Sequence, residues 1–171
     1  EFTSKQEGIN ILFPNMITCA IIDDEPLAVT LLESYVKREP ELDLKGKFLG
    51  AREALDALKE TPVDLVFLDI QMPELTGLEL SRQLPARTYV IFTTAYSQYA
   101  IQGYRANAVG YLLKPISFAD FKETFDFARR RITGQAMPDP IVPAEEAQPA
   151  AAPAESRPTA SKETVAADRS I

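Results

Sequence analysis

The chain contains no histidine and only one cysteine among its 171 residues. Without histidine, it cannot itself serve as a phosphohistidine donor. The single cysteine, Cys19, excludes an internal disulfide, and its place inside an apolar run fits a reducing compartment. We therefore expect a cytoplasmic protein.

Other absences narrow the class of protein further. No apolar stretch reaches the roughly 18 residues of a membrane span, and the first residues lack the basic start and apolar centre of a signal peptide. No Gly-x-x-x-x-Gly-Lys loop is present, which argues against nucleotide binding. The net charge of −7 argues against a surface that coats nucleic acid. The one basic cluster, Arg129–Arg131, ends a predicted helix, where it is favourable for the helix dipole.

Composition divides the chain into three parts. Residues 1–15 form an N-terminal extension, and its first two residues, Glu-Phe, are typical of a cloning scar. Residues 16–133 carry alternating strand and helix patterns, and with 46% apolar residues in the chain they can build one domain core. Residues 134–171 are rich in proline and alanine and have no aromatic residue. Such a segment buries too little apolar surface to offset its ordering entropy, so we expect a disordered linker.

Four short apolar runs each end on residues with reactive side chains. The runs are Ile17–Ile22, Val63–Leu68, Tyr89–Phe92 and Val109–Leu113. They end on Asp23 and Asp24, on Asp69, on Thr93 and Thr94, and on Lys114-Pro115. Apolar runs of this length, separated by helical patterns, predict buried parallel strands. Since parallel strands share one direction, the residues that follow them should meet at one edge of the sheet.

The complete pattern predicts five strand–helix pairs in a flavodoxin-like α/β fold with strand order 2-1-3-4-5. A further strand is expected at Leu42–Phe48, and the helices are expected after Pro26 and near Ala51–Glu60, Leu78–Gln83, Ser97–Arg105 and Phe118–Ile132. In the first helix, Leu27, Leu31 and Tyr35 recur every four residues and predict an apolar stripe. In the last helix the aromatic residues recur at helical spacing and predict core packing.

The residues at the strand ends suit a magnesium-dependent phosphoryl acceptor. Mg²⁺ prefers oxygen ligands and usually takes one or two carboxylates, which Asp23, Asp24 and Asp69 can supply. An aspartate can be the nucleophile that forms an aspartyl phosphate. Lys114 offers a cation for the charge on the phosphoryl oxygens, and the Lys-Pro step can aim its side chain. A hydroxyl at Thr94 can donate to the attached group.

Each feature also has an ordinary structural explanation. Acidic residues before a helix stabilise its amino terminus, threonine caps helices, and a single lysine can be a surface residue. The four features occur in this order at successive strand ends, and that joint pattern favours the functional interpretation.

These residues resemble the receiver domain of bacterial two-component response regulators over about residues 17–132. The resemblance rests on Ile21–Pro26, Leu68–Pro73, Thr93–Tyr96 and Tyr111–Ile116. It implies that Asp69 is the phosphoacceptor and that Asp23, Asp24, Asp69 and the Gln71 backbone carbonyl hold Mg²⁺. It further implies that Lys114 contacts the phosphoryl group, that Thr94 is the switch hydroxyl and that Tyr111 is the switch aromatic.

The runs Phe92–Tyr96 and Ala108–Pro115 are similar to receivers of LytTR-type regulators, whose second domain binds DNA. The resemblance implies a sensor histidine kinase as partner, a switch rather than a metabolic reaction, and a possible homodimer through the fourth helix, fifth strand and fifth helix. Nothing after residue 133 resembles the DNA-binding module, so we expect no direct DNA binding by this chain. The alternatives are a Mg²⁺-dependent phosphatase or phosphotransferase with an aspartate nucleophile, and a receiver-like module used only for assembly.

Overall fold

The computed structural model describes residues 16–96 and 108–135 of the chain. Its elements, in chain order, are β1 (Ile17–Ile22), α2 (Pro26–Val36), β2 (Leu42–Phe48), α3 (Ala51–Glu60), β3 (Leu65–Asp69), α4 (Gly77–Gln83), β4 (Tyr89–Thr94), β5 (Ala108–Leu113) and α6 (Phe118–Thr133). The expected helix near Ser97–Arg105, the whole N-terminal extension and nearly all of the expected linker lie outside the described residues.

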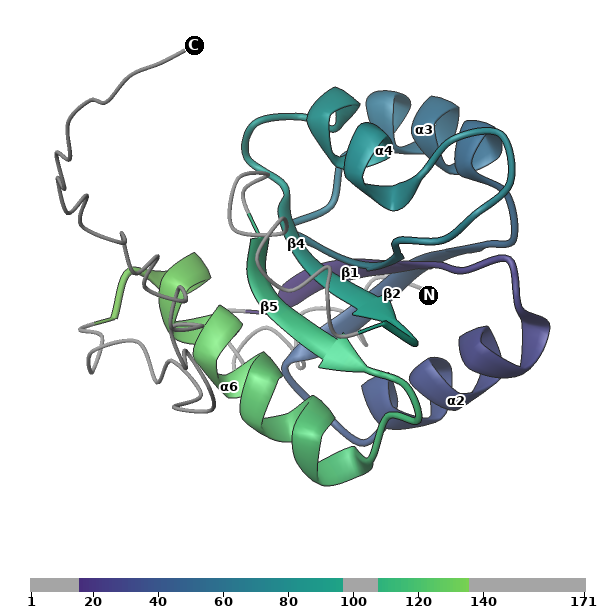
Figure 1. Cartoon of the computed structure of the whole chain (residues 1–171). Helices are drawn as coiled ribbons and strands as arrows, with labels where there is room; N and C mark the ends of the chain where they lie inside the picture. Colours follow the sequence, from purple (N-terminus) through teal and green to yellow (C-terminus); the bar gives the residue numbers. More distant parts are fainter. Residues whose placement is uncertain (1–15, 97–107, 136–171) are drawn as a thin grey trace, which may run out of the picture. The chain divides into compact units, whose positions relative to one another are not determined.

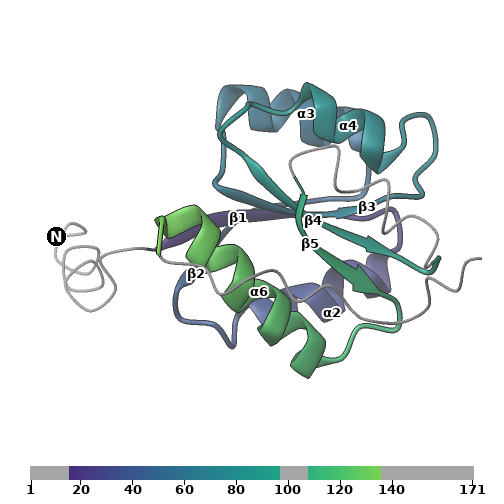
Figure 2. The ribbon, with the colours of Figure 1, turned by 60° about the vertical axis from the view of Figure 1, so that its left-hand side comes forward.

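The five strands form one parallel sheet in the order β2-β1-β3-β4-β5. This confirms the predicted flavodoxin-like architecture. Helices α2 and α6 cover one face of the sheet, and α3 and α4 cover the other (Figures 1 and 2). Because both faces are covered, the central strand β3 is buried along its whole length, which explains its continuous apolar sequence.

Side chains from alternate strand positions build a separate core on each face of the sheet. Under α2 and α6, Phe67 stacks on Phe121, whose ring also stacks on that of Phe125. Under α3 and α4, strand residues such as Phe92 pack against Leu55 and Leu80 of the helices. Phe121 and Phe125 of α6 are therefore core residues, and Phe118 packs partly buried against the same core, as their spacing predicts.

The predicted apolar stripe on α2 is wrong. Leu27 and Leu31 are 84% and 38% exposed, whereas Val29, Leu32 and Val36 form the buried face. Residues four apart on a helix advance by about 40° around its axis, so the predicted stripe winds across the helix surface. It begins on the solvent side at Leu27 and comes near the core only at Tyr35, which is half-buried.

The end of β4 also differs from the sequence prediction. The residues Thr93 and Thr94 belong to β4 itself, where each pairs with a residue of β5. Helix α4 begins at Gly77 after a capping box, in which Thr76 and Glu79 each bond to the other's backbone N–H.

Within the part of the chain that the structure describes, no helix has the length and apolar character needed to cross a membrane.

Candidate functional site

Three predicted carboxylates meet at the carboxyl edge of the sheet. Asp69 is the last residue of β3, and Asp23 and Asp24 follow β1, the neighbouring strand. One carboxylate oxygen from each of the three lies within 4.8 Å of the others. Asp23 and Asp69 are almost fully buried, at 0% and 3% exposure. The parallel sheet therefore brings together residues that are 45 or more positions apart in the sequence.

Lys114 reaches this carboxylate cluster from the end of β5. Its Nζ atom lies 2.8 Å from Asp23 Oδ2, 3.5 Å from Glu25 Oε1 and 3.8 Å from Asp69 Oδ1. Its backbone N–H donates to the carbonyl of Thr94 at 2.7 Å, which ties the lysine to the end of β4. The Lys114-Pro115 peptide bond is cis. The ammonium thus partly neutralises the three carboxylates.

Burial and mutual repulsion perturb the acidic groups of the site. Burial, followed by the charge of Asp23, raises the pKa of Asp69 to about 7, although Lys114 and a backbone hydrogen bond from Gln71 act in the opposite direction. Burial also raises the pKa of Asp23, against the lowering effect of the hydrogen bond from Lys114. For Lys114, burial alone would lower the pKa, but the hydrogen bond that the ammonium donates to Asp23 and the charge of the nearby carboxylates raise it overall. The site therefore holds more buried negative charge than one ammonium can balance.

The donor set fits a small divalent cation. Mg²⁺ binds oxygens at about 2.1 Å, so ligands on opposite sides of the ion are about 4.2 Å apart. The three carboxylate oxygens all lie within 4.8 Å of one another, a limit only slightly above that separation. The Gln71 backbone lies at the site because its N–H bonds to the Asp69 carboxylate. The metal role of the Gln71 carbonyl stays a prediction.

The two threonines at the end of β4 lie on opposite faces of the sheet. Thr93 pairs with Asp69 in the ladder between β3 and β4, and it follows Tyr89 and Ile91 on the face that α2 and α6 cover. Thr94 points to the other face, and its hydroxyl accepts a hydrogen bond from the Tyr96 N–H at 3.2 Å. Both threonines are fully buried. Among the described residues, the Thr93 hydroxyl has no hydrogen-bond partner.

Tyr111, the predicted switch aromatic, lies on β5 beside these residues. Its ring packs, partly buried, against the core beneath α3 and α4. Its hydroxyl donates to the carbonyl of Tyr96 at 2.7 Å. This hydrogen bond links Tyr111 to Tyr96, which follows Thr94 by two residues. A movement of either tyrosine therefore affects the other.

One residue in contact with the site was not singled out from the sequence. A Cβ added to Gly77, at the start of α4, would collide with the carbonyl oxygen of Asp69 and lie 2.9 Å from Ile70 Cα. The Gly77 N–H also donates to the Ile70 carbonyl at 2.8 Å. Only a glycine lets α4 pack this closely on the backbone of the predicted phosphoacceptor. The sequence signal was the Gly that closes the turn after Pro73.

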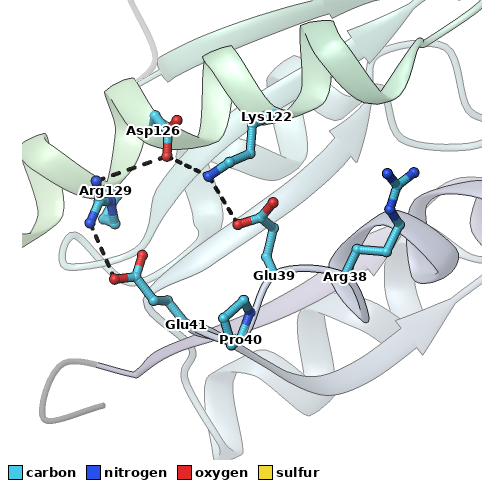
Figure 3. Close-up of a pocket in the computed structure, with 7 residues that line it drawn as sticks. All are labelled: Arg38, Glu39, Pro40, Glu41, Lys122, Asp126 and Arg129. Carbon is cyan, nitrogen blue, oxygen red and sulfur yellow. Dashed lines mark hydrogen bonds and ion pairs between the residues drawn. The ribbon is translucent and has the colours of Figure 1, made fainter. Parts of the chain in front are cut away.

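A charged groove lies at some distance from this site, between α6 and the turn from α2 to β2 (Figure 3). Apart from Arg38, which stacks on the Phe118 ring, its acidic and basic residues pair with one another. Lys122 bonds to Glu39 at 3.1 Å and to Asp126 at 2.9 Å, and Arg129 bonds to Glu41 at 3.2 Å. These ion pairs brace α6 against the turn, and they do not bring reactive groups together as the sheet edge does.

The amino-acid sequence of residues 19–126 matches the response regulator receiver domain family. The chain belongs to this family. Receiver domains are modules of response regulators, and the three-carboxylate cluster with Lys114 lies within the matched segment.

Known relatives of this receiver agree with that assignment. An uncharacterized response regulatory protein of Vibrio vulnificus is 42% identical over 111 residues, covering 64% of this chain and 46% of the relative. The transcriptional regulatory protein BtsR of Escherichia coli is 37% identical over 122 residues, covering 70% of this chain and 51% of BtsR. The crystal structure of the response regulatory domain of MrkE from Klebsiella pneumoniae superposes with a TM-score of 0.64 at 25% identity, covering 70% of this chain and all of that domain. The chain thus spans about half the length of the curated relatives it matches.

Proposed function

We propose that this receiver accepts a phosphoryl group on Asp69 from a sensor histidine kinase in a Mg²⁺-dependent reaction. The observation that carries the proposal is the grouping of one buried carboxylate, two further carboxylates within 4.8 Å and the Lys114 ammonium at 3.8 Å. This grouping supplies a nucleophile, a metal site and a cation at one point. It is the minimum set that transfer of a phosphoryl group to aspartate requires.

The transfer is balanced in atoms and electrons. A carboxylate oxygen of Asp69 attacks phosphorus, and an O–P bond forms as the N–P bond of the kinase's phosphohistidine breaks. The electron pair of the broken bond returns to the imidazole nitrogen. Lys114 meets the negative charge on the phosphoryl oxygens, for which it must leave part of its contact with Asp23.

Asp23, Asp24, Asp69 and the Gln71 carbonyl are the residues that we propose to hold Mg²⁺. A bound ion would supply positive charge against the phosphoryl oxygens and so favour in-line attack. The chain's own residues set the geometry. The backbone N–H of Glu25 donates to Asp23 Oδ1 at 2.9 Å, so that this carboxylate is fixed before any ion arrives.

Phosphorylation would act as a conformational switch. It adds nearly two negative charges at Asp69, and we propose that Thr94 then donates to the new oxygens. Thr94 would give up its bond to the Tyr96 N–H, and the hydrogen bond from Tyr111 to the Tyr96 carbonyl passes this change to β5. The expected result is a population shift of about 1–3 kcal/mol on the face that includes β5 and α6.

The output of the whole protein is proposed from its relatives. BtsR carries the name of a transcriptional regulatory protein, and the chain covers about half of it. We propose that this receiver is of the LytTR type and controls transcription, with residues 134–171 as a linker and the β5–α6 side as a possible homodimer face. DNA binding would then need a further domain beyond the receiver.

The proposal is tested by incubating the protein with Mg²⁺ and acetyl phosphate and measuring intact mass. The expected result is the addition of one phosphoryl group, lost in Asp69→Asn and in the presence of EDTA. The matched control is Asp56→Asn, which changes an exposed aspartate of α3 in the same way and should be phosphorylated like the parent. A folded parent that gains no mass, from acetyl phosphate or from a cognate kinase, would favour an assembly role instead.

A further inference from the structure

The segment that carries Lys114 into the site is held at both ends. On its amino side, the Lys114 N–H donates to the Thr94 carbonyl at 2.7 Å. Pro115, the next residue, has no N–H to donate. On its carboxyl side, the carbonyl of Ile116 accepts a hydrogen bond from the hydroxyl of Tyr35 at 2.9 Å. This contact joins residues 81 positions apart in the sequence.

Tyr35 is itself held in a fixed position. Its ring packs edge-on against Phe118, with ring centres 5.4 Å apart, and against Phe121 at 5.5 Å. Both phenylalanines belong to α6, the helix that follows the lysine segment. With its ring clamped, Tyr35 can hold its hydroxyl in one direction at little further cost in side-chain entropy.

Helix α2 links this contact to the acidic end of the site. The helix begins at Pro26, two residues after Asp24, and Tyr35 lies near its other end. One rigid helix therefore connects the carboxylates that face Lys114 with the backbone that carries Lys114. A hydroxyl on this helix fixes the lysine segment relative to the acidic groups.

We propose that Tyr35 is a positioning residue for phosphoryl transfer, acting through Lys114. By holding the Ile116 carbonyl, its hydroxyl keeps the Lys114–Ile116 backbone where the ammonium can meet both Asp23 and the phosphoryl group on Asp69. The inference rests on the proposed function. Small displacements of a charged group from its productive place slow a reaction markedly, and Tyr35 touches none of the three carboxylates that would hold the metal.

A positioning role of Tyr35 predicts that loss of its hydroxyl slows phosphorylation and leaves the Mg²⁺ affinity unchanged. In Tyr35→Phe, the ring and its packing remain and only the hydroxyl is lost. We expect phosphorylation by acetyl phosphate at saturating Mg²⁺ to slow by about fivefold, in the range that one net hydrogen bond represents. The Mg²⁺ dissociation constant should stay within about twofold of the parent value, since the carboxylates keep their places.

The matched control is Thr88→Val. The Thr88 hydroxyl donates to the Val63 carbonyl at 2.9 Å, the same length as the Tyr35 bond, but at the opposite edge of the sheet. Thr88→Val should lose about as much thermal stability as Tyr35→Phe and should keep the phosphorylation rate of the parent. A purely structural effect of Tyr35 would instead make the two variants alike.

The deciding experiment compares five proteins: the parent, Tyr35→Phe, Lys114→Ala, the double variant and Thr88→Val. Two quantities are measured for each, the phosphorylation rate and the hydrogen exchange of the peptide that spans residues 113–117. The inference predicts that Tyr35→Phe slows the parent, adds nothing in the Lys114→Ala background, and speeds exchange of that peptide where Thr88→Val does not. The inference would be overturned if Tyr35→Phe kept the parent phosphorylation rate, or if it slowed the reaction equally in the parent and in the Lys114→Ala background. Unchanged hydrogen exchange of the peptide in Tyr35→Phe would also overturn the inference. If the parent takes up no phosphoryl group, the proposed function fails, whereas the exchange result still reports on the contact.

Discussion

Replacement of Gly77 by alanine should damage both the stability and the chemistry of this receiver. The added Cβ collides with the carbonyl oxygen of Asp69 and lies 2.9 Å from both Asp69 C and Ile70 Cα. All three atoms belong to the backbone, so no side chain can rotate away to make room. Overpacking of this kind costs about 1–3 kcal/mol, and the better helix propensity of alanine returns at most about 1 kcal/mol. With the full gain in helix propensity subtracted, the net expected loss is about 0–2 kcal/mol.

The same collision should displace the nucleophile. Gly77 also donates its N–H to the Ile70 carbonyl, so α4 cannot move back without breaking that bond. We expect phosphorylation of Gly77→Ala to be slower by about tenfold or more, because the reacting carboxylate shifts from its place among the other charges. Urea unfolding followed by circular dichroism gives the stability, and intact mass over time gives the rate.

Gly50→Ala is the matched control for this prediction. Nothing lies within 4 Å of a Cβ at Gly50, which precedes α3 in an extended conformation that any residue adopts. It should retain the parent rate and nearly the parent stability. If Gly77→Ala behaved like Gly50→Ala, the close packing of α4 on the Asp69 backbone would be refuted as a constraint on the site.

Two further predictions concern Asp69 and Glu74. The pKa of Asp69 in the folded chain, about 7, lies above its ordinary value of 3.8. Between these pH values the folded state keeps a proton on the Asp69 carboxyl that the unfolded state loses. The contribution of Asp69 to the free energy of unfolding is therefore lost as the pH rises through about 7. In Mg²⁺-free buffer, Asp69→Asn should therefore exceed the parent in unfolding free energy by about 4 kcal/mol at pH 8, since a shift of about three pKa units corresponds to about that free energy; a gain that did not shrink toward pH 5 would contradict this. Glu74 has a φ of 68°, so Glu74→Gly should stabilise the chain by about 1 kcal/mol in urea, despite loss of an exposed ion pair with Arg52. A less stable glycine variant would show that the turn depends on the Glu74 side chain.

The strands and the acidic cluster were predictable because their signals are local. β1 and β3 read as uninterrupted apolar runs, and a parallel sheet places Asp23, Asp69 and Lys114 at one edge whatever the details of packing. Strand order followed from the alternation of strands and helices. The distances of Lys114 to its partners, and the consequent pKa of Asp69, required the folded chain.

What the sequence could not supply depends on contacts between distant residues. The face of α2 that is buried was predicted incorrectly, because a spacing of four fits two neighbouring stripes and Leu27 and Leu31 turned out exposed. The sequence predicted Tyr35 only as part of an apolar stripe. The hydrogen bond from its hydroxyl to the Ile116 carbonyl could not be predicted. The tight approach of Gly77 to Asp69 is equally invisible until α4 is placed.

The most direct test of the central claim is to identify the phosphorylated residue. Borohydride reduces an aspartyl phosphate to homoserine, so the protein is phosphorylated with Mg²⁺ and donor, reduced, digested and mapped by mass spectrometry. We predict homoserine at position 69 alone, and none when Mg²⁺ is withheld. Homoserine at position 23 or 24, or none at all in a folded protein given a competent donor, would contradict the assignment of Asp69 as the phosphoacceptor.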